Sequence, residues 1–398
     1  TVTLSVWDHD HIGTDDAVGA IRFKLSDLPL TLPGTCGPPI FSNKMDLFPN
    51  WFNIYGAPPE ADYQSGAKSA LVAYAMNHGS REGTYFRGRL LMRIWKRLDP
   101  VARLCAYDLP IDSTLTQAFK ETVSGTKSDD SRQFVAEYKE TVSFDPAHLG
   151  EQLYKAITET RWQLRLGGYE ASDMALANTG MFGRDVFVEA RVGANSKMSK
   201  GHSVQEGRAV FNEVFEDIDL TYPEVWSTEE KPQFPDIFLY LVRGNSHIAY
   251  VRWTAHELLA HTKNESRMGD PKWFPFIEEP CLDAFGPGEI PGSLLCNIQL
   301  GKEGTLEARG GFQLLETKTT QYQMRFHLYM AKFLPAKDEN GLCDPYVVVK
   351  YHGKTLYSSV KSETCNPSWY ETLVCDVAVP DKAGLAPPVS VLLYVFFF

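Results

Sequence analysis

Three carboxylates follow a strand pattern at the start of the chain, and their spacing suits the binding of a metal ion. Residues 2–6 alternate apolar and polar side chains, which is typical of a half-buried strand. Asp8, Asp10 and Asp16 come directly after this strand in one short loop. Carboxylates gathered at a strand end repel one another unless a cation neutralises them, and hard oxygen ligands on a flexible loop favour calcium. The alternative interpretation is an acidic turn that only water solvates.

A second pair of carboxylates lies near the other end of the chain, again after a strand pattern. Residues 324–330 alternate apolar and polar side chains, and the loop that follows carries Asp338 and Asp344 six residues apart. Further on, Asn366 and Pro367 favour the start of a turn, and Trp369 is large enough to anchor the next strand. We therefore interpret these two carboxylates as candidate metal ligands at the end of a second β-rich unit.

Both acidic loops resemble calcium-binding loops of C2 domains. The positions of Asp8, Asp10 and Asp16 match the third loop of that family. Asp338 and Asp344, in Leu-Pro-Ala-x-Asp followed by Asp-Pro-Tyr-Val, match the first loop. The resemblance implies an all-β chain of tandem C2-type eight-stranded β-sandwiches, with Ca²⁺ as the cofactor.

The resemblance also implies that the two end copies are incomplete. Residues 1–57 correspond to the C-terminal part of a C2 domain, whose other carboxylate ligands are expected upstream. Residues 317–398 correspond to the N-terminal part of another C2 domain, truncated before its third loop. The chain is therefore expected to be a fragment of a longer protein.

The charge of the chain limits the partners that it can bind. The formal net charge is −11, which argues against nucleic acid and against constitutive binding to anionic membranes. Binding to anionic phospholipid membranes would need a cation or inserted apolar side chains, and Ile12 in the first acidic loop is the candidate membrane contact. No apolar run reaches the 18 or more residues that a membrane-spanning helix requires.

The cysteines indicate a reducing environment. The chain has seven cysteines, an odd number, and none of them form a Cys-x-x-Cys motif. This spacing predicts neither a disulfide framework nor a zinc site, and it is typical of a cytosolic setting.

Two internal segments resemble the ferlins, large tail-anchored proteins of vesicle fusion and membrane repair that carry several C2 domains in series. Residues 51–56 and 83–92 resemble the junction after the third named C2 domain of that family, and residues 234–300 resemble its FerB segment. An Arg- and Trp-rich DysF insertion is missing, so the architecture is closer to the otoferlin kind. The resemblance implies fusion-machinery proteins as further partners. It also implies a place on the cytosolic face of a vesicle or the plasma membrane, with the tail anchor outside this fragment.

Residues 85–312 predict a middle C2-like domain that contains the FerB-like segment. Eight strand-like runs are separated by Gly, Pro and Asn turns, beginning with the run at 89–95. A helix over 146–160 is expected within an insertion at 97–160, and a short helix near 254–261. Residues 58–84 are expected to be a linker, with a loop up to residue 80. The turn at 243–247 carries no carboxylate, so this domain is predicted to bind no calcium and to act as a scaffold.

Residues 1–57 contain only part of a β-sandwich, so some of their strand edges lack a partner within the chain. We expect them either to pack an exposed sheet edge on the middle domain or to be poorly ordered.

The sequence favours a protein that is not an enzyme. His256 and His261 are five residues apart, so on one helix they would point roughly 140° apart and could not share a zinc ion. A Gly-x-Ser-x-Gly elbow, a phosphate-binding Gly-Lys-Ser and a dinucleotide fingerprint are absent from the sequence. Two alternatives to calcium-dependent membrane binding stay open: a calcium-independent C2 scaffold for protein contacts, or the targeting region of a lipid-modifying enzyme.

Overall fold

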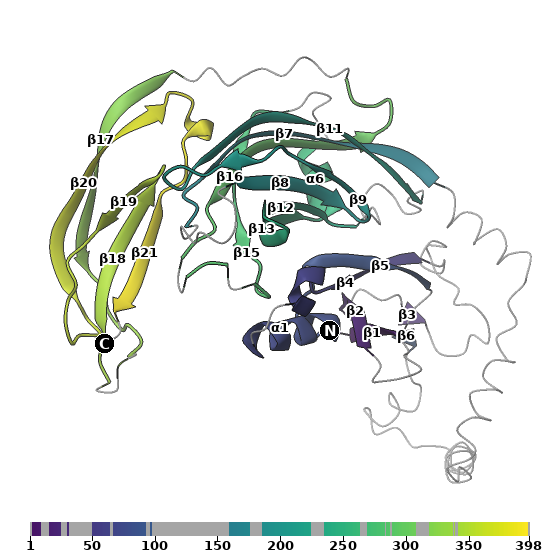
Figure 1. Cartoon of the computed structure of the whole chain (residues 1–398), viewed down its shortest axis with the longest axis horizontal. Helices are drawn as coiled ribbons and strands as arrows, with labels where there is room; N and C mark the ends of the chain where they lie inside the picture. The colour runs from purple at the N-terminus through teal and green to yellow at the C-terminus, as the bar shows by residue number, and fades with distance from the viewer. Residues whose placement is uncertain are drawn as a thin grey trace, which may run out of the picture.

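The structure of the chain is a computed structural model, and it is built mostly of antiparallel β-sheets (Figure 1). This confirms the predicted all-β class. The residues that the structure describes are 2–8, 16–24, 30–31, 50–63, 67–92, 96–97, 159–175, 185–223, 235–262, 269–307 except 283 and 287–288, and 318–396 except 337 and 339–340. No helix within these ranges is long and apolar enough to cross a bilayer.

The N-terminal unit is a four-stranded antiparallel sheet with the order β1-β2-β4-β5. Ile21 and Ile54 are buried in it, and Gly19 lets β2 approach β4 closely, because a Cβ at Gly19 would lie 2.9 Å from the carbonyl oxygen of Tyr55. A separate pair of two-residue strands, β3 (Leu30–Thr31) and β6 (Lys96–Arg97), runs parallel. The four strands of the sheet are β1 (Val2–Asp8), β2 (Asp16–Phe23), β4 (Asn50–Gly56) and β5 (Tyr85–Met92).

Strand β5 and the segment before it differ from the interpretation of the sequence. The prediction that the run at 89–95 opens the middle domain is wrong, because β5 pairs with β4 of the N-terminal sheet along its whole length. The predicted loop at 58–80 instead contains a 3-10 helix, η3 (Pro59–Tyr63), and an α-helix, α1 (Ala67–Asn77). Four of the eleven residues of α1 are alanine, the residue with the highest helix propensity, but the helix lacks a clear apolar stripe that would have predicted it.

The middle unit is a sandwich of two sheets around the largest hydrophobic core of the described residues. Its strands match every predicted run except the first. One sheet has the order β10-β8-β12-β13-β15, with β9 pairing β8, and the other has the order β11-β7-β16-β14. The strands of the first sheet are β8 (Asp185–Val192), β9 (Asn195–Met198), β10 (His202–Ser203), β12 (Ile237–Arg243), β13 (Ser246–Trp253) and β15 (Ile277–Glu278). Those of the second are β7 (Glu159–Ser172), β11 (Ala209–Pro223), β14 (Lys272–Pro275) and β16 (Ser293–Lys302).

The two predicted helices of the middle unit have different outcomes. The helix expected near 254–261 is present as α6 (Ala255–Thr262). Thr254 and Glu257 form a capping box at its start, in which the Thr254 Oγ1 accepts from the Glu257 N–H at 3.2 Å and Glu257 Oε2 accepts from the Thr254 N–H at 2.8 Å. The helix expected over 146–160 lies outside the described residues, except for its last two positions, which begin β7.

An aromatic layer joins the N-terminal sheet to the outer face of the β8-β12-β13 sheet. Phe238 and Tyr240 on β12 are buried, with Tyr55 of β4 and Tyr85 of β5 packed against them. The Tyr240 hydroxyl donates a hydrogen bond to the Thr84 carbonyl at 2.7 Å. The N-terminal unit therefore packs on the middle unit as expected for residues 1–57, but through an aromatic face of the sheet and with help from β5, and not through an exposed sheet edge.

Removing the hydroxyl of Tyr240 tests this contact. Burial, followed by the charge of Glu279, raises the pKa of Tyr240 well above its ordinary value, so the hydroxyl stays protonated and donates. We expect Tyr240→Phe to lower the free energy of unfolding by about 1 kcal/mol, as measured by urea denaturation. Tyr322→Phe is the matched control, because Tyr322 is exposed and its loss of a hydroxyl should change stability by less than about 0.5 kcal/mol. Equal stability of both variants would contradict the assigned hydrogen bond.

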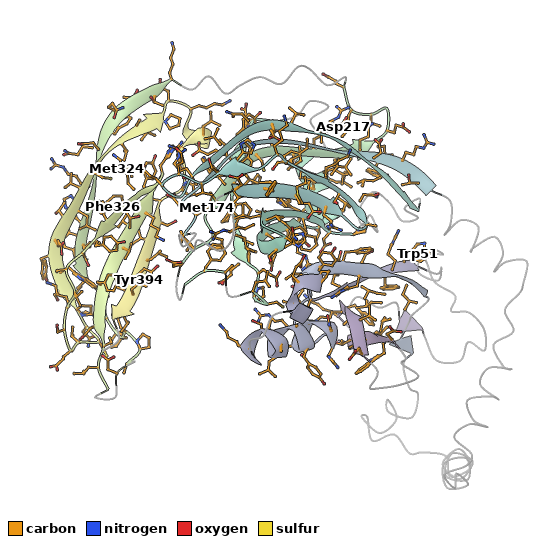
Figure 2. All side chains as sticks on the ribbon, viewed as in Figure 1. Trp51, Met174, Asp217, Met324, Phe326 and Tyr394 are labelled. Atoms are coloured by element: carbon orange, nitrogen blue, oxygen red, sulfur yellow. The ribbon has the colours of Figure 1, made fainter. Side chains whose placement is uncertain are left out.

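The last unit has two small sheets that face each other. Figure 2 shows Met324 and Phe326 on β17, and the cores around them include Val349, Trp369 and Tyr351. Its strands are β17 (Thr319–Met330) paired with β20 (Ser368–Pro380), and β19 (Lys354–Tyr357), β18 (Asp344–Tyr351) and β21 (Ser390–Phe396), in the order β19-β18-β21.

The last unit also contacts the middle unit. The side chain of Asp173 accepts hydrogen bonds from the backbone N–H groups of His352 and Gly353 at 3.2 and 2.8 Å. Trp273 Nε1 donates to the carbonyl oxygen of Leu385 at 2.9 Å. The middle unit therefore lies between the two end units and contacts both (Figure 1).

Candidate functional site

The hairpin of β1 and β2 brings two of the predicted carboxylates together. Asp8 and Asp16 are the last residue pair of this antiparallel ladder, and both side chains are exposed. Directly opposed residues in such a ladder lie on the same face, with Cβ atoms about 4.5–5.5 Å apart. Asp10 and Ile12 belong to the connecting residues 9–15, which lie outside the described part of the chain.

The position of Asp8 opposite Asp16 is electrostatically unfavourable without a cation. Like charges directly opposite each other on a sheet destabilise the pair by roughly 0.2–1 kcal/mol. A bound cation would offset this repulsion, because two carboxylates on one face can both supply oxygen ligands to the same ion. Asp8 and Asp16 therefore lie on one face at the end of the hairpin, where a cation placed between them would relieve the repulsion.

Tyr74 of helix α1 and His78, which follows the helix, form an aromatic group with Trp7 of β1 that was not predicted from the sequence. Trp7, which precedes Asp8, makes an edge-to-face contact with His78 at a ring distance of 4.8 Å. His78 in turn stacks on Tyr74 at 3.6 Å. Trp7 is 49% exposed and Tyr74 is 62% exposed, so an aromatic surface lies beside the acidic end of the hairpin.

The second pair of predicted carboxylates lies where β18 begins. Asp344 is the first residue of β18, is buried, and accepts a hydrogen bond from the Glu363 N–H at 2.5 Å. Asp338 lies in the preceding loop, where its backbone carbonyl accepts from the N–H of Gly341 at 3.0 Å. Asp344 is paired with Phe396, the last residue of β21.

The electrostatics of Cys343 show that both carboxylates lie close to it. The pKa of the Cys343 thiol is raised to about 11 by burial, by its hydrogen bond with Cys365, and by the negative charges of Asp338 and Asp344. A carboxylate affects a neighbouring pKa in this way only over a short distance. Asp338 and Asp344 therefore share one local environment at this end of the unit.

Phe333 is an exposed aromatic side chain at the same end of the last unit. It is 90% exposed and adopts a φ of +59°, which is strained for a bulky residue. Its N–H donates to the side-chain oxygen of Asn366 at 3.0 Å, which holds the backbone in this conformation. Phe333 was not predicted from the sequence, although a large apolar residue next to an acidic loop is a usable signal.

The turn at residues 243–247 of the middle unit is a tight hairpin. Arg243 pairs with Ser246, and Gly244 adopts a φ of +62°. His247 lies inside the protein, where it contacts Glu189 and Glu60 through its two ring nitrogens. Across the described residues, no three His, Cys, Asp or Glu side chains are grouped as metal ligands.

Comparison with known proteins places the C2 family at both ends of the chain. The family model described as C2 domain matches residues 1–36 and 322–389. The chain is 27% identical to Fer-1-like protein 4 of Mus musculus in an alignment of 172 residues that covers 38% of this chain and 8% of that protein. It is 28% identical to ferlin 1 of Toxoplasma gondii over 149 residues, which is 37% of this chain and 9% of that protein.

A solved structure of two calcium-bound C2 domains of extended-synaptotagmin 2 is similar at 15% identity. The similarity covers 59% of this chain and 96% of the extended-synaptotagmin 2 chain, with a TM-score of 0.25.

The chain is a C2 domain protein. It has distant homology to ferlins, and it spans less than a tenth of the length of the two ferlins above.

Proposed function

We propose that the two end units bind anionic phospholipid membranes when calcium occupies their acidic loops. The observation that carries this proposal is the direct pairing of Asp8 with Asp16 at the exposed end of a hairpin. Such a pair is unfavourable without a cation, and the chain as a whole has a net charge of −11. Calcium would make each acidic tip locally positive, so that attraction to anionic headgroups replaces repulsion.

Apolar side chains beside the carboxylates would complete the membrane contact. Phe333 at the last unit is almost fully exposed and near Asp338, and Ile12 follows Asp10 in the first loop. Apolar loop side chains can enter the headgroup layer once the charge of the loop no longer opposes it. Metal ligands in this proposal are Asp8, Asp10 and Asp16 in the first unit, and Asp338 and Asp344 in the last.

The middle unit would act as a scaffold that holds the two membrane-binding units. It lies between them and makes buried contacts with the N-terminal sheet through the aromatic layer. We assign residues 1–57 and 317–398 to C2 domains. Strand β5 belongs to the N-terminal sheet, and we assign the remainder of residues 85–312 to the middle domain. With the ferlin homology, this arrangement supports a role in vesicle trafficking, membrane fusion or membrane repair on the cytosolic face of a membrane.

Sedimentation with liposomes tests the proposal at the last unit. We expect the double variant Asp338→Asn and Asp344→Asn to weaken calcium-dependent binding of the chain to phosphatidylserine liposomes by about tenfold or more. The variant keeps size and hydrogen bonding but removes two charges, and each charge at a membrane surface contributes about 1 kcal/mol. Asp185→Asn is the control, because it removes a carboxylate charge from the start of β8 in the middle unit, away from the proposed site.

Three outcomes of this experiment distinguish a calcium switch at either end unit from a calcium-independent scaffold. Loss of binding in the double variant alone supports the calcium switch at the last unit. Equal binding with and without calcium in all proteins would contradict it and favour a calcium-independent scaffold for protein contacts. Calcium-dependent binding that persists in the double variant would assign the switch to the first unit. The targeting region of a lipid-modifying enzyme is the third candidate, and it differs in requiring a catalytic domain on the same protein.

A further inference from the structure

Two thiols lie together at the end of the last unit. The Sγ atoms of Cys343 and Cys365 are 3.7 Å apart, although the residues are 22 positions apart in sequence. The Cys343 thiol also contacts the carbonyl oxygen of Thr364 at 3.3 Å, and the Cys365 thiol contacts that of Gly341 at 3.9 Å. Each thiol therefore lies against the backbone segment that carries the other.

The backbone around the two thiols is held in register by hydrogen bonds. The Thr364 N–H donates to the Cys343 carbonyl at 2.8 Å, and the Leu334 N–H donates to the Cys365 carbonyl at 3.0 Å. A disulfide has an S–S length of about 2.05 Å and needs backbones that are already close. Here the backbones are adjacent, so rotation of the two side chains can close the remaining gap.

We infer that Cys343 and Cys365 form a reversible disulfide when the protein meets a mild two-electron oxidant such as glutathione disulfide. The two thiols differ in accessibility in a way that sets the order of events. Cys365 is partly exposed, whereas Cys343 is buried. An oxidant from solvent therefore reacts first at Cys365, and Cys343 is the resolving thiol. In a reducing compartment both cysteines stay reduced as thiols.

The reaction proceeds through two thiol–disulfide exchanges. The Cys365 sulfur attacks one sulfur of glutathione disulfide, the S–S bond of the oxidant breaks, and one glutathione leaves as its thiol. The Cys343 sulfur then attacks the Cys365 sulfur of the mixed disulfide, and the second glutathione leaves as its thiol. Both cysteines are oxidised, one glutathione disulfide is reduced to two glutathiones, and the two cysteine protons end on the released thiols.

Mass spectrometry of the whole chain tests the inference. The folded protein is incubated with glutathione disulfide, its remaining thiols are blocked with N-ethylmaleimide in denaturant, and it is digested without reduction. We expect the cross-linked peptide pair that contains Cys343 and Cys365 to exceed any cross-link to Cys296 or Cys375 by about tenfold or more. These two thiols are buried and serve as internal comparisons. Excess reduced glutathione should return the pair to thiols.

The serine variants test the order of the two steps. In Cys343→Ser, Cys365 should accumulate as the mixed disulfide with glutathione, because the resolving thiol is gone. In Cys365→Ser, Cys343 should stay unmodified. Two results in the unmutated protein would overturn the inference without any variant: both cysteines fully blocked by N-ethylmaleimide, or a mixed disulfide on Cys365 that persists. The experiment is done without added calcium, so its result is separate from the test of calcium binding by the neighbouring carboxylates.

Discussion

Replacing His247 with Leu is expected to lower the free energy of unfolding by about 3–5 kcal/mol, because it leaves two carboxylates inside the protein without their shared partner. His247 on β13 donates from Nε2 to Glu189 at 2.6 Å and from Nδ1 to Glu60 at 3.1 Å. Its side chain is 9% exposed, that of Glu189 is 4% exposed, and that of Glu60 is 22% exposed. Glu60 lies in η3 and Glu189 in β8, so the same side chain also ties the segment after the N-terminal sheet to the middle unit.

The effect of this substitution should depend on pH in a defined direction. Burial opposes the charge of His247, but the hydrogen bonds to Glu189 and Glu60 outweigh it and raise the pKa of the imidazole from 6.5 to about 9. A raised pKa means that the folded state holds the proton more tightly than the unfolded state. The stabilisation is therefore complete below pH 6.5 and is lost as the pH rises through 9.

Urea denaturation at several pH values measures this contribution. The difference in unfolding free energy between the unmutated chain and His247→Leu should shrink by roughly 3 kcal/mol between about pH 6 and pH 10, from the pKa shift at about 1.4 kcal/mol per unit. His327→Leu is the control, because His327 is exposed and shares a hydrogen bond of 2.9 Å with the hydroxyl of Thr372 at the surface. A difference that is constant over this pH range would contradict a charged His247.

Replacing Asp16 with Asn should stabilise the chain without calcium and remove most of the stabilisation that calcium adds. Without calcium, the substitution ends the repulsion between Asp8 and Asp16, which amounts to roughly 0.2–1 kcal/mol. With millimolar calcium, the unmutated protein should gain thermal stability because the ion binds the folded state. The variant should gain much less, since one ligand charge is lost. Differential scanning calorimetry with and without calcium measures both effects.

Salt and a matched variant make this second test specific. The stabilisation without calcium should shrink at about 1 M NaCl, where the screening length is about 3 Å. Asp185→Asn removes an exposed charge from the middle unit and should leave the calcium response intact. If the Asp16→Asn protein responded to calcium as strongly as the unmutated chain, the hairpin end would not be a calcium site.

Several strands were predictable because only one face of each is buried, and such burial leaves an alternating pattern in the sequence. β17 and β20 follow this rule, and the capping box of α6 marks its first turn in the same local way. The position of β5 was not predictable by these means. Strand β5 pairs with β4 across a connection that contains α1. An alternating pattern indicates that a segment is a strand, but it does not indicate which sheet the strand joins.

The carboxylates of the candidate sites were predictable from spacing, but their surroundings were not. Asp8 and Asp16 lie opposite each other because a hairpin pairs residues on either side of its loop, which sequence can express. The strained backbone of Phe333 and the approach of Cys343 to Cys365 depend on contacts between segments far apart in the chain. Nothing local in the sequence reports such contacts, so only the structure reveals them.

The pairing of β5 with β4 decides where this chain can be cut. A recombinant fragment that stops at residue 57 would leave the edge of β4 unpaired. A second fragment that starts after residue 57 would contain β5 without its partner strand β4. Bare edges of this kind recruit strands from other molecules and promote aggregation. A transplantable N-terminal piece must therefore extend through Met92, and when excised it exposes the aromatic face of Tyr55 and Tyr85 to water.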